Sequence, residues 1–239
     1  MTNIETEYTG LISGILHGGK PKADRTGTGT RAVFGRMLYH DMKLGFPLLT
    51  KKKIIFNHAK TELFWIVSGR TDLGYLINNG VKYWVPDYQR SGRTDGTLGP
   101  VYGHQWRNAN GIDQLQMVLQ ELRENPTSRR LMVSAWNVHD LHDMVLPPCH
   151  YNFQLFSNDG KLDLMWQQRS ADVFLGLPYD IAMYGLLLEM IAEGAGYEPG
   201  KLIASLGDCH LYNNHLEQAE EYIAAKQYDL PKLKMEWGG

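Results

Sequence analysis

The chain has 239 residues, of which 43% are hydrophobic and 21% charged, the composition of an ordinary globular protein. Its 24 Lys and Arg residues nearly balance its 26 Asp and Glu residues, so no strong positive field is available to hold a nucleic-acid backbone. Two cysteines cannot build a disulfide framework, and their number fits a reducing, cytoplasmic setting. Glu5 and Glu7 argue against a signal peptide, and no apolar stretch is long enough to span a membrane. We therefore expect one domain over residues 1–239 that requires neither a membrane nor a nucleic acid as a partner.

The spacing of apolar residues predicts a mixture of helices and strands. A repeat of three to four residues predicts helices at 8–16, 54–68, 72–78, 112–122, 180–193 and 211–225. Alternating apolar residues predict strands at 31–39, 130–136, 151–155, 162–166 and 202–206, with a hairpin turn at 158–160. Residues 85–104 are rich in glycine and proline and are predicted to form a long loop. Because strands and helices do not alternate regularly, the pattern favours an α+β fold over a doubly wound sheet.

Cys149 is a candidate nucleophile. It follows two prolines in the run Leu-Pro-Pro-Cys-His at 146–150, and the prolines stiffen the approach to it. A lone cysteine is more often a buried apolar residue, but a nearby cation can lower the pKa of a thiol and activate it. Successive side chains of a strand point to opposite faces, so we expect arginines rather than His150 to activate this thiol. We expect the second cysteine, Cys209, to be structural.

Four arginines are candidates for a phosphate clamp. Arg25 lies in a turn rich in glycine and threonine, where backbone N–H groups can also meet a phosphate. Arg129 and Arg130 open a predicted strand, and Arg169 stands at the end of another. Two or more guanidinium groups that converge on one dianion would bind it, although each alone is more often a surface ion pair. The His and Asp residues of 139–143 lack a third anchor at metal-ligand spacing, so we expect no metal site.

Eight segments resemble the thymidylate synthase family in order and spacing. They are DRTGTGT (24–30), FPLLTKK (46–52), TELFWIVSG (61–69), LGPVYGHQWR (98–107), SRRLMVSAWN (128–137), LPPCH (146–150), QRSADVFLGLPYDIAMY (168–184) and GDCHLYNNH (207–215). The resemblance implies a three-layer α/β/α fold around a large mixed, mainly antiparallel sheet, and a homodimer. It also implies transfer of a one-carbon group from 5,10-methylenetetrahydrofolate to C5 of a pyrimidine nucleotide, without a metal.

The resemblance also implies a role for each candidate residue. Cys149 would add to C6 of the pyrimidine ring. Glu62 would organise water and proton transfer, Tyr102 would assist proton removal at C5, and His150 would hold water beside the group at C4. The implied phosphate ligands are Arg25, Arg169 and Ser170 of one subunit, with Arg129 and Arg130 reaching the site of the other subunit. The remaining implied nucleotide contacts are Gln168, Asp180, His210 and Tyr212. The implied folate contacts are Trp84, Leu146, Asp172, Gly176 and Tyr179.

One departure from the family bears on the substrate. The family has Asn in the run GLPxNIA, where this chain has Asp180. An Asn amide donates to O4 and accepts from N3–H, which matches uracil. Cytosine inverts both groups, and a carboxylic acid that shares a proton with N3 can accept from N4–H. The wrong ring leaves a buried polar group unpaired, at about 1–3 kcal/mol per group. Asp180 therefore indicates deoxycytidylate, as in the related phage deoxycytidylate hydroxymethylases, which carry Asp at the matching position.

Two further departures bear on the product. Family members continue past the LPKL segment into a tail that closes over folate, whereas this sequence stops at Gly239. A missing lid would admit water, which completes a hydroxymethyl group, whereas hydride from tetrahydrofolate completes a methyl group. Residues 53–57 replace a basic and imidazole set on the folate wall, and Asp87 lies near the usual place of a second tryptophan. We expect folate to be held differently here.

These patterns predict a deoxycytidylate 5-hydroxymethyltransferase, an activity that suits a phage with modified cytosine in its DNA. A deoxycytidylate 5-methyltransferase is an alternative that Trp84 favours, and a thymidylate synthase acting on deoxyuridylate is another. A non-catalytic nucleotide- or RNA-binding relative is a further alternative, against which intact Cys149, Glu62 and Tyr102 argue. A cysteine hydrolase is the weakest alternative, because no ordered Cys/His/Asn set stands out.

Overall fold

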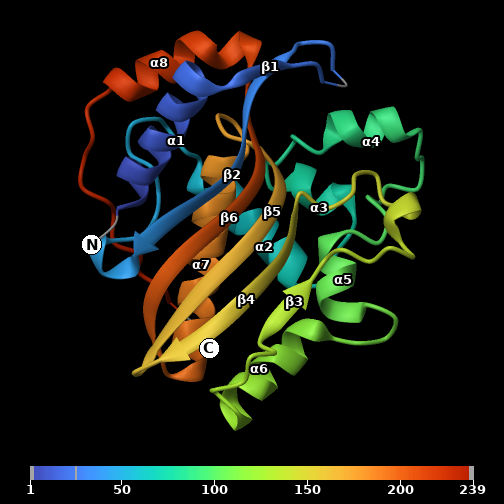
Figure 1. Cartoon of the computed structure of the whole chain (residues 1–239). Coiled ribbons are helices and arrows are strands. Elements are labelled where there is room, and N and C mark those ends of the chain that lie inside the picture. Colours follow the sequence, from blue (N-terminus) through green and yellow to red (C-terminus); the bar gives the residue numbers. More distant parts are fainter. Residues whose placement is uncertain (1–2, 25, 237–239) are drawn as a thin grey trace.

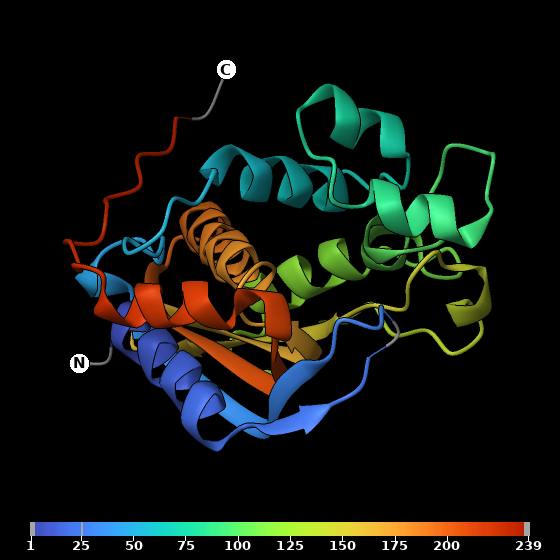
Figure 2. The same cartoon turned by 90° about the horizontal axis from the view of Figure 1, so that it is seen from above.

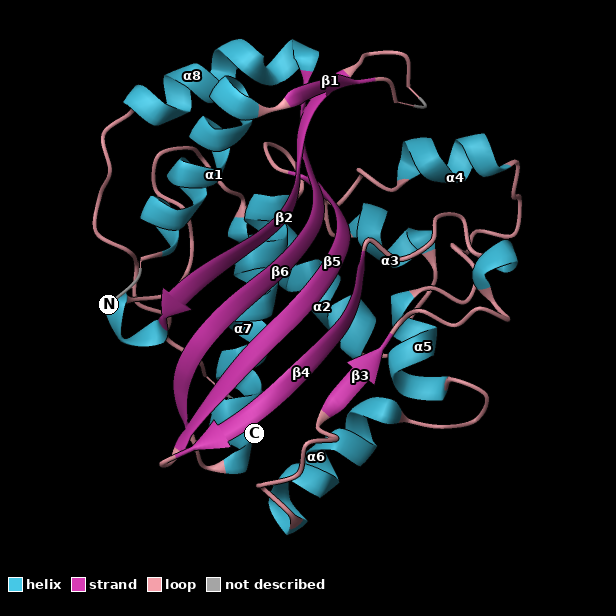
Figure 3. Cartoon of the chain, viewed as in Figure 1, coloured by secondary structure: helices cyan, strands magenta, loops and turns pink. Residues whose placement is uncertain are grey.

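The computed structural model describes residues 3–24 and 26–236 (Figures 1 and 3). The helices are α1 (Ile4–Gly18), α2 (Phe56–Val67), α3 (Leu73–Asn78), α4 (Val85–Ser91), α5 (Tyr102–Asn108), α6 (Gln114–Glu124), α7 (Leu177–Ala195) and α8 (Leu216–Ala224). The strands are β1 (Lys20–Lys22), β2 (Thr30–Asp41), β3 (Met132–Ser134), β4 (His150–Asn158), β5 (Lys161–Asp172) and β6 (Glu198–Tyr212). None of these helices is both long and apolar enough to cross a membrane.

The described strands form a single mixed sheet in the order β1-β2-β6-β5-β4-β3. All neighbours are antiparallel except β5 and β6, which run parallel and are joined through α7. The predicted hairpin turn connects β4 to β5, where Asp159 (φ 48°) and Gly160 (φ 77°) adopt the left-handed conformation that such a turn needs. The expected α+β class with a mixed, mainly antiparallel sheet is confirmed.

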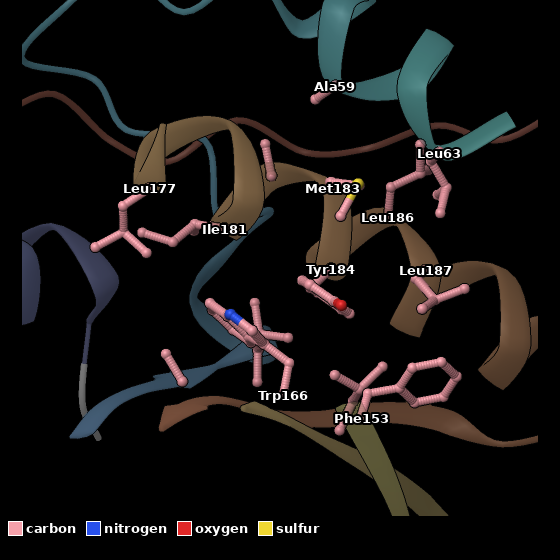
Figure 4. Packing of buried hydrophobic residues seen from close by; sticks show 14 of the residues in the cluster. Ala59, Leu63, Phe153, Trp166, Leu177, Ile181, Met183, Tyr184, Leu186 and Leu187 are labelled. Carbon is pink, nitrogen blue, oxygen red and sulfur yellow. The ribbon is translucent and has the colours of Figure 1, made fainter. Parts of the chain in front are cut away.

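The main core lies between the sheet and two layers of helix. The ring of Tyr184 on α7 stacks on Trp166 of β5, with centroids 5.0 Å apart, and Phe153 of β4 lies beside them (Figure 4). On its other side α7 meets Ala59 and Leu63 of α2 (Figure 4). Seen from above, α7 lies between the sheet and α2 (Figure 2).

The opposite face of the sheet is open, so the expected layer order is corrected. Met37, Tyr39 and Phe156, which lie on that face, are 40%, 42% and 60% exposed. The register places buried Leu38, Ala204 and Trp166 side by side on the other face. The layers follow the order sheet, α7, α2, and the sheet is not enclosed between two helical layers.

The alternation of buried residues shifts in two neighbouring strands where the candidate site lies. In β5 the buried positions are even-numbered up to Gln168 and then shift to Ala171, and β6 shifts in the same way between Leu206 and Cys209. A Cβ on Gly207 would stand 2.8 Å from the backbone oxygen of Arg169, so the two strands approach closely only because this residue is glycine. The shift turns the side chains that follow it in both strands toward one region.

Two predicted elements are wrong in extent. The predicted loop 85–104 contains α4 and the start of α5, because Pro86 suits the first turn of a helix and Gly103 lies within one. Gly103 lets α5 approach the backbone, since a Cβ there would lie 2.2 Å from the oxygen of Arg70. The helix predicted from residue 211 begins at Leu216, because residues 211 and 212 still pair with β2.

Candidate active site

Two cavities meet at Cys149. The larger has a volume of about 540 Å³ and the smaller about 370 Å³. Both are lined by Leu146, Cys149, Ser170 and Asp172. The larger also contains Glu62, Trp84, Tyr102, His150, Gln168, Gly176, Tyr179 and Asp180, and the smaller also contains Arg169, His210 and Tyr212. Segments far apart in the sequence therefore converge around one thiol.

The loop before β4 holds a cation beside the Cys149 thiol. Arg169 donates from Nε to the carbonyl oxygen of Pro148 (2.9 Å) and from Nη2 to that of Pro147 (2.8 Å). The same Nη2 lies 3.9 Å from Cys149 Sγ. The prolines lack backbone donors, but their carbonyl oxygens fix the guanidinium group. A positive charge so placed stabilises a thiolate and favours nucleophilic attack.

His150 faces the larger cavity as a neutral ring. Its Nδ1 lies 2.9 Å from the hydroxyl of Tyr184, and its ring stacks on Tyr102 with centroids 4.2 Å apart. Burial lowers the pKa of His150 to about 3, so the imidazole is uncharged at neutral pH. Tyr102 in turn accepts a hydrogen bond from the backbone N–H of Cys149 (2.9 Å). His150 is thus a polar wall of the cavity and supplies no positive charge to the thiol.

Asp180 lies in the first turn of α7, inside the larger cavity. Its Oδ2 accepts a hydrogen bond from Gln168 Nε2 (2.9 Å), and its Oδ1 lies 4.0 Å from His150 Nε2. Trp166 Nε1 donates to Gln168 Oε1 (3.1 Å), which orients the amide so that its NH₂ group faces Asp180. Burial raises the pKa of Asp180 to about 7, and the charges of Glu62 and Asp172 add to this effect. A neutral carboxylic acid is therefore accessible at this position near neutral pH.

Glu62 is a second buried carboxyl of the same cavity. Trp84 Nε1 donates to its Oε1 (2.8 Å), and the Tyr83 hydroxyl donates to its Oε2. Burial raises the pKa of Glu62, and these two hydrogen bonds oppose the rise. Tyr83 was not anticipated from the sequence, because it belongs to no periodic pattern and its role depends on a contact with a distant helix.

The far wall of the larger cavity is aromatic and well ordered by hydrogen bonds. The rings of Tyr179 and His58 stack with centroids 6.2 Å apart. Asp172 Oδ1 accepts from the backbone N–H groups of Phe174 (3.1 Å) and Leu175 (3.0 Å), which shapes the loop that leads into α7. Flat rings and apolar groups together suit a planar heterocycle.

The smaller cavity has a polar wall. His210 Nδ1 lies 3.0 Å from Asp208 Oδ1, and the rings of His210 and Tyr212 are nearly perpendicular with centroids 5.4 Å apart. Lys22 forms an ion pair with Asp208 at the rim. Hydroxyl, imidazole and guanidinium groups on one wall suit a sugar phosphate.

Comparison with known proteins agrees with this geometry. A family model described as thymidylate synthase matches residues 6–238. A thymidylate synthase of Corynebacterium aurimucosum is 46% identical over 239 residues, which span 98% of this chain and 88% of the relative. The chain belongs to the thymidylate synthase family. It is a folate-dependent transferase of one-carbon groups, and methylenetetrahydrofolate is its co-substrate.

Most residues that the resemblance to the thymidylate synthase family implied lie together around Cys149. Three do not. Arg25 lies outside the described residues. Arg129 and Arg130 are exposed, precede β3 and line neither of the two cavities.

Folate, as co-substrate of this family, fits the wall formed by Trp84, Leu146 and Tyr179. Lys52 stands at its edge, where its Nζ donates to the backbone oxygen of Phe174 (2.6 Å) and burial lowers its pKa. Aromatic and apolar groups would hold the ring system of folate. Lys52 lines the same cavity, where it would bind the anionic tail of folate.

Proposed function

We propose that this enzyme transfers the one-carbon unit to C5 of deoxycytidylate and that water completes a 5-hydroxymethyl group. The observation that carries the choice of base is Asp180, a buried carboxyl whose pKa is raised to about 7. A neutral carboxylic acid has one donor and one acceptor oxygen, so it can donate to N3 of cytosine and accept from N4–H.

Uracil fits this acid less well. It presents N3–H and the acceptor O4, the reverse of the acceptor and donor of cytosine, and the hydrogen bond from Gln168 to Oδ2 keeps the acid proton on Oδ1. An unpaired buried polar group costs about 1–3 kcal/mol, and sites built on such bonds discriminate strongly between otherwise similar substrates.

The proposed reaction proceeds through a covalent bond to the enzyme. Cys149 Sγ adds to C6, and the electron pair that moves to C5 attacks the methylene carbon of the co-substrate. The proton on C5 leaves to water held near Tyr102, and tetrahydrofolate departs. The oxygen of a water molecule, deprotonated by Glu62, adds to the exocyclic methylene carbon. The C6–S bond then breaks and returns the thiolate to Cys149. The atoms balance as deoxycytidylate, methylenetetrahydrofolate and water in, and hydroxymethyldeoxycytidylate and tetrahydrofolate out.

Two other outcomes have support of their own. Trp84 is buried and forms part of the wall on which the co-substrate would lie, which favours a retained folate and a methyl product. The 46% identical relative is named a thymidylate synthase, which favours deoxyuridylate. The methyl product would be accompanied by dihydrofolate, because the hydride that reduces the exocyclic methylene then comes from the folate ring.

We also propose that the enzyme is a cytoplasmic homodimer with Arg129 and Arg130 in the phosphate site of the other subunit. The open face of the sheet, with exposed Met37, Tyr39 and Phe156, is the apolar surface that such a dimer would cover. Subunits that lack Cys149 and subunits that lack both arginines would each be inactive alone. Mixing them should restore activity, because one site per mixed dimer would then contain Cys149 together with both arginines.

The product assay separates these functions. Purified enzyme is incubated with deoxycytidylate or deoxyuridylate and isotope-labelled methylenetetrahydrofolate, the product mass is measured, and dihydrofolate is followed by absorbance. We expect labelled hydroxymethyldeoxycytidylate and no dihydrofolate. Turnover of deoxyuridylate but not deoxycytidylate would contradict the proposed base, and dihydrofolate release with deoxycytidylate would contradict the proposed product.

A further inference from the structure

Glu62 and Asp180 are two buried carboxyls of one cavity. Glu62 is 8% exposed, and the side chain of Asp180 is 15% exposed. A charge on Glu62 raises the pKa of Asp180, as expected for like charges in a poorly solvated site. Near neutral pH the pair therefore favours a state in which one carboxyl is protonated and the other is ionised.

The two carboxyls differ in the number of side-chain donors they receive. Glu62 accepts from the Tyr83 hydroxyl and from Trp84 Nε1, one on each oxygen. Asp180 accepts only from Gln168 among the described side-chain hydrogen bonds. A hydrogen-bond donor favours the charged form of its acceptor, so two donors on Glu62 direct the proton to Asp180.

Tyr83 contacts both carboxyl-bearing elements. It lies two residues before α4 and donates to Glu62 on α2. Its ring packs against Tyr179 (centroids 6.4 Å apart), the neighbour of Asp180 on α7. The residue is 43% exposed, so its ring also forms part of the cavity wall. The change Tyr83→Phe removes this donor to Glu62 and keeps the aromatic ring, whereas removal of the Trp84 donor would change the indole ring itself.

Several titratable groups near the pair do not compete for this proton. Tyr102 and Tyr184 remain neutral because burial raises the pKa of each well above its usual value. His150 remains neutral because burial lowers its pKa to about 3. The charge of Asp172 raises the pKa of Asp180 further, and Lys52 lies beside Asp172 rather than beside Glu62.

We propose that Tyr83 is a positioning residue whose hydroxyl keeps Glu62 ionised and so leaves the shared proton on Asp180. Glu62 then serves as the base that deprotonates water, and Asp180 forms the hydrogen bonds that distinguish one pyrimidine from another. The second half of this inference rests on the proposed use of deoxycytidylate. The first half concerns Glu62 alone and holds for either base.

The variant Tyr83→Phe tests the proposal, because it removes only the hydroxyl. Loss of a donor to a carboxylate raises the pKa of that carboxylate, so Glu62 would stay protonated to a higher pH. We expect the acid limb of the kcat profile to move upward by about 1–2 pH units, the size of one hydrogen bond to a charged group. We also expect the preference for deoxycytidylate over deoxyuridylate in kcat/KM to fall about threefold to tenfold. Tyr228→Phe, at an exposed tyrosine remote from these contacts, is the matched control.

Infrared difference spectra measure the protonation states of the two carboxyls independently, without a change at Tyr83. At pH 6 the Asp180→Asn variant should lose a protonated carboxyl band, and Glu62→Gln should lose a carboxylate band. The reverse assignment would overturn the inference, as would a Tyr83→Phe variant with reduced kcat but an unmoved acid limb. An enzyme that uses deoxyuridylate alone overturns the proposed function, yet a shifted acid limb with that substrate would still support the role of Tyr83 toward Glu62.

Discussion

The two cavities that meet at Cys149 differ in how their polar groups are held. In the smaller cavity, His210, Asp208 and Lys22 pair with one another near the surface. In the larger cavity, Glu62 and Asp180 are buried, and burial raises the pKa of both. The smaller cavity suits the sugar phosphate, which deoxycytidylate and deoxyuridylate share. The larger cavity is the one that we propose for the base, where the two nucleotides differ.

This difference shows where specificity can arise. Charged groups near water interact weakly and tolerate change, whereas a buried carboxyl must match the protons of its partner. We therefore expect changes around the smaller cavity to weaken both substrates alike. Changes at Asp180 should alter the preference for one nucleotide over the other. Changes at the junction, where the two cavities meet at Cys149 and Arg169, should abolish the reaction of both nucleotides.

The junction gives the largest expected effect. Cys149→Ser should lower kcat by roughly 10⁴-fold or more with either nucleotide, because the hydroxyl is a much weaker nucleophile than a thiolate beside Arg169. Cys209→Ala is the control, since burial raises the pKa of the Cys209 thiol to about 12 and keeps it unreactive. Steady-state rates and the site of iodoacetamide labelling measure this. Labelling of Cys209 in preference to Cys149 would contradict the assignment.

The buried carboxyl of Asp180 in the larger cavity should also make the free energy of unfolding depend on pH. The pKa of Asp180 rises from 3.8 to about 7 on folding, so the folded protein binds a proton that the unfolded chain has lost in this range. The free energy of unfolding therefore falls as pH rises from about 4 to 7 and is level above that. Asp180→Asn removes this penalty and should stabilise the protein at pH 8 by up to the order of 4 kcal/mol. Thermal unfolding at pH 5 and pH 8 measures it, and an equal gain at both pH values would contradict the buried neutral acid.

The cation at the junction gives a smaller effect. Arg169→Lys keeps the charge but loses the fork that binds the oxygens of Pro147 and Pro148. We expect kcat/KM to fall about 10- to 100-fold for both nucleotides, the size of one to two hydrogen bonds from a charged donor. Arg123→Lys, at an exposed position on α6, serves as the control. A loss of kcat/KM for only one nucleotide would contradict the expectation that Arg169 acts on both nucleotides alike.

Local sequence patterns sufficed for the elements that carry their own signals. The hairpin turn at 158–160 needs glycine and aspartate in left-handed conformations, and both residues stand there. The prolines before Cys149 and the family motifs led to most of the lining residues. The α+β class followed from the irregular order of strands and helices.

Other features depend on contacts between distant segments, which no local pattern contains. Gly103 reads as a loop residue, yet it lies inside α5 because another backbone passes close to it. The layer order depends on which sheet face α7 covers. The contact between Tyr83 and Glu62 joins residues on separate elements, and the orientation of Gln168 depends on the indole of Trp166.

The central claim is that the buried acid Asp180 selects cytosine, and its most direct test is the ratio of kcat/KM for deoxycytidylate to that for deoxyuridylate. The ratio is measured at pH 7 for the unchanged enzyme, for Asp180→Asn, and for Asp143→Asn as a control at an exposed carboxyl. We predict that the unchanged enzyme and the control favour deoxycytidylate and that Asp180→Asn favours deoxyuridylate. A ratio that is the same in all three proteins would contradict the account.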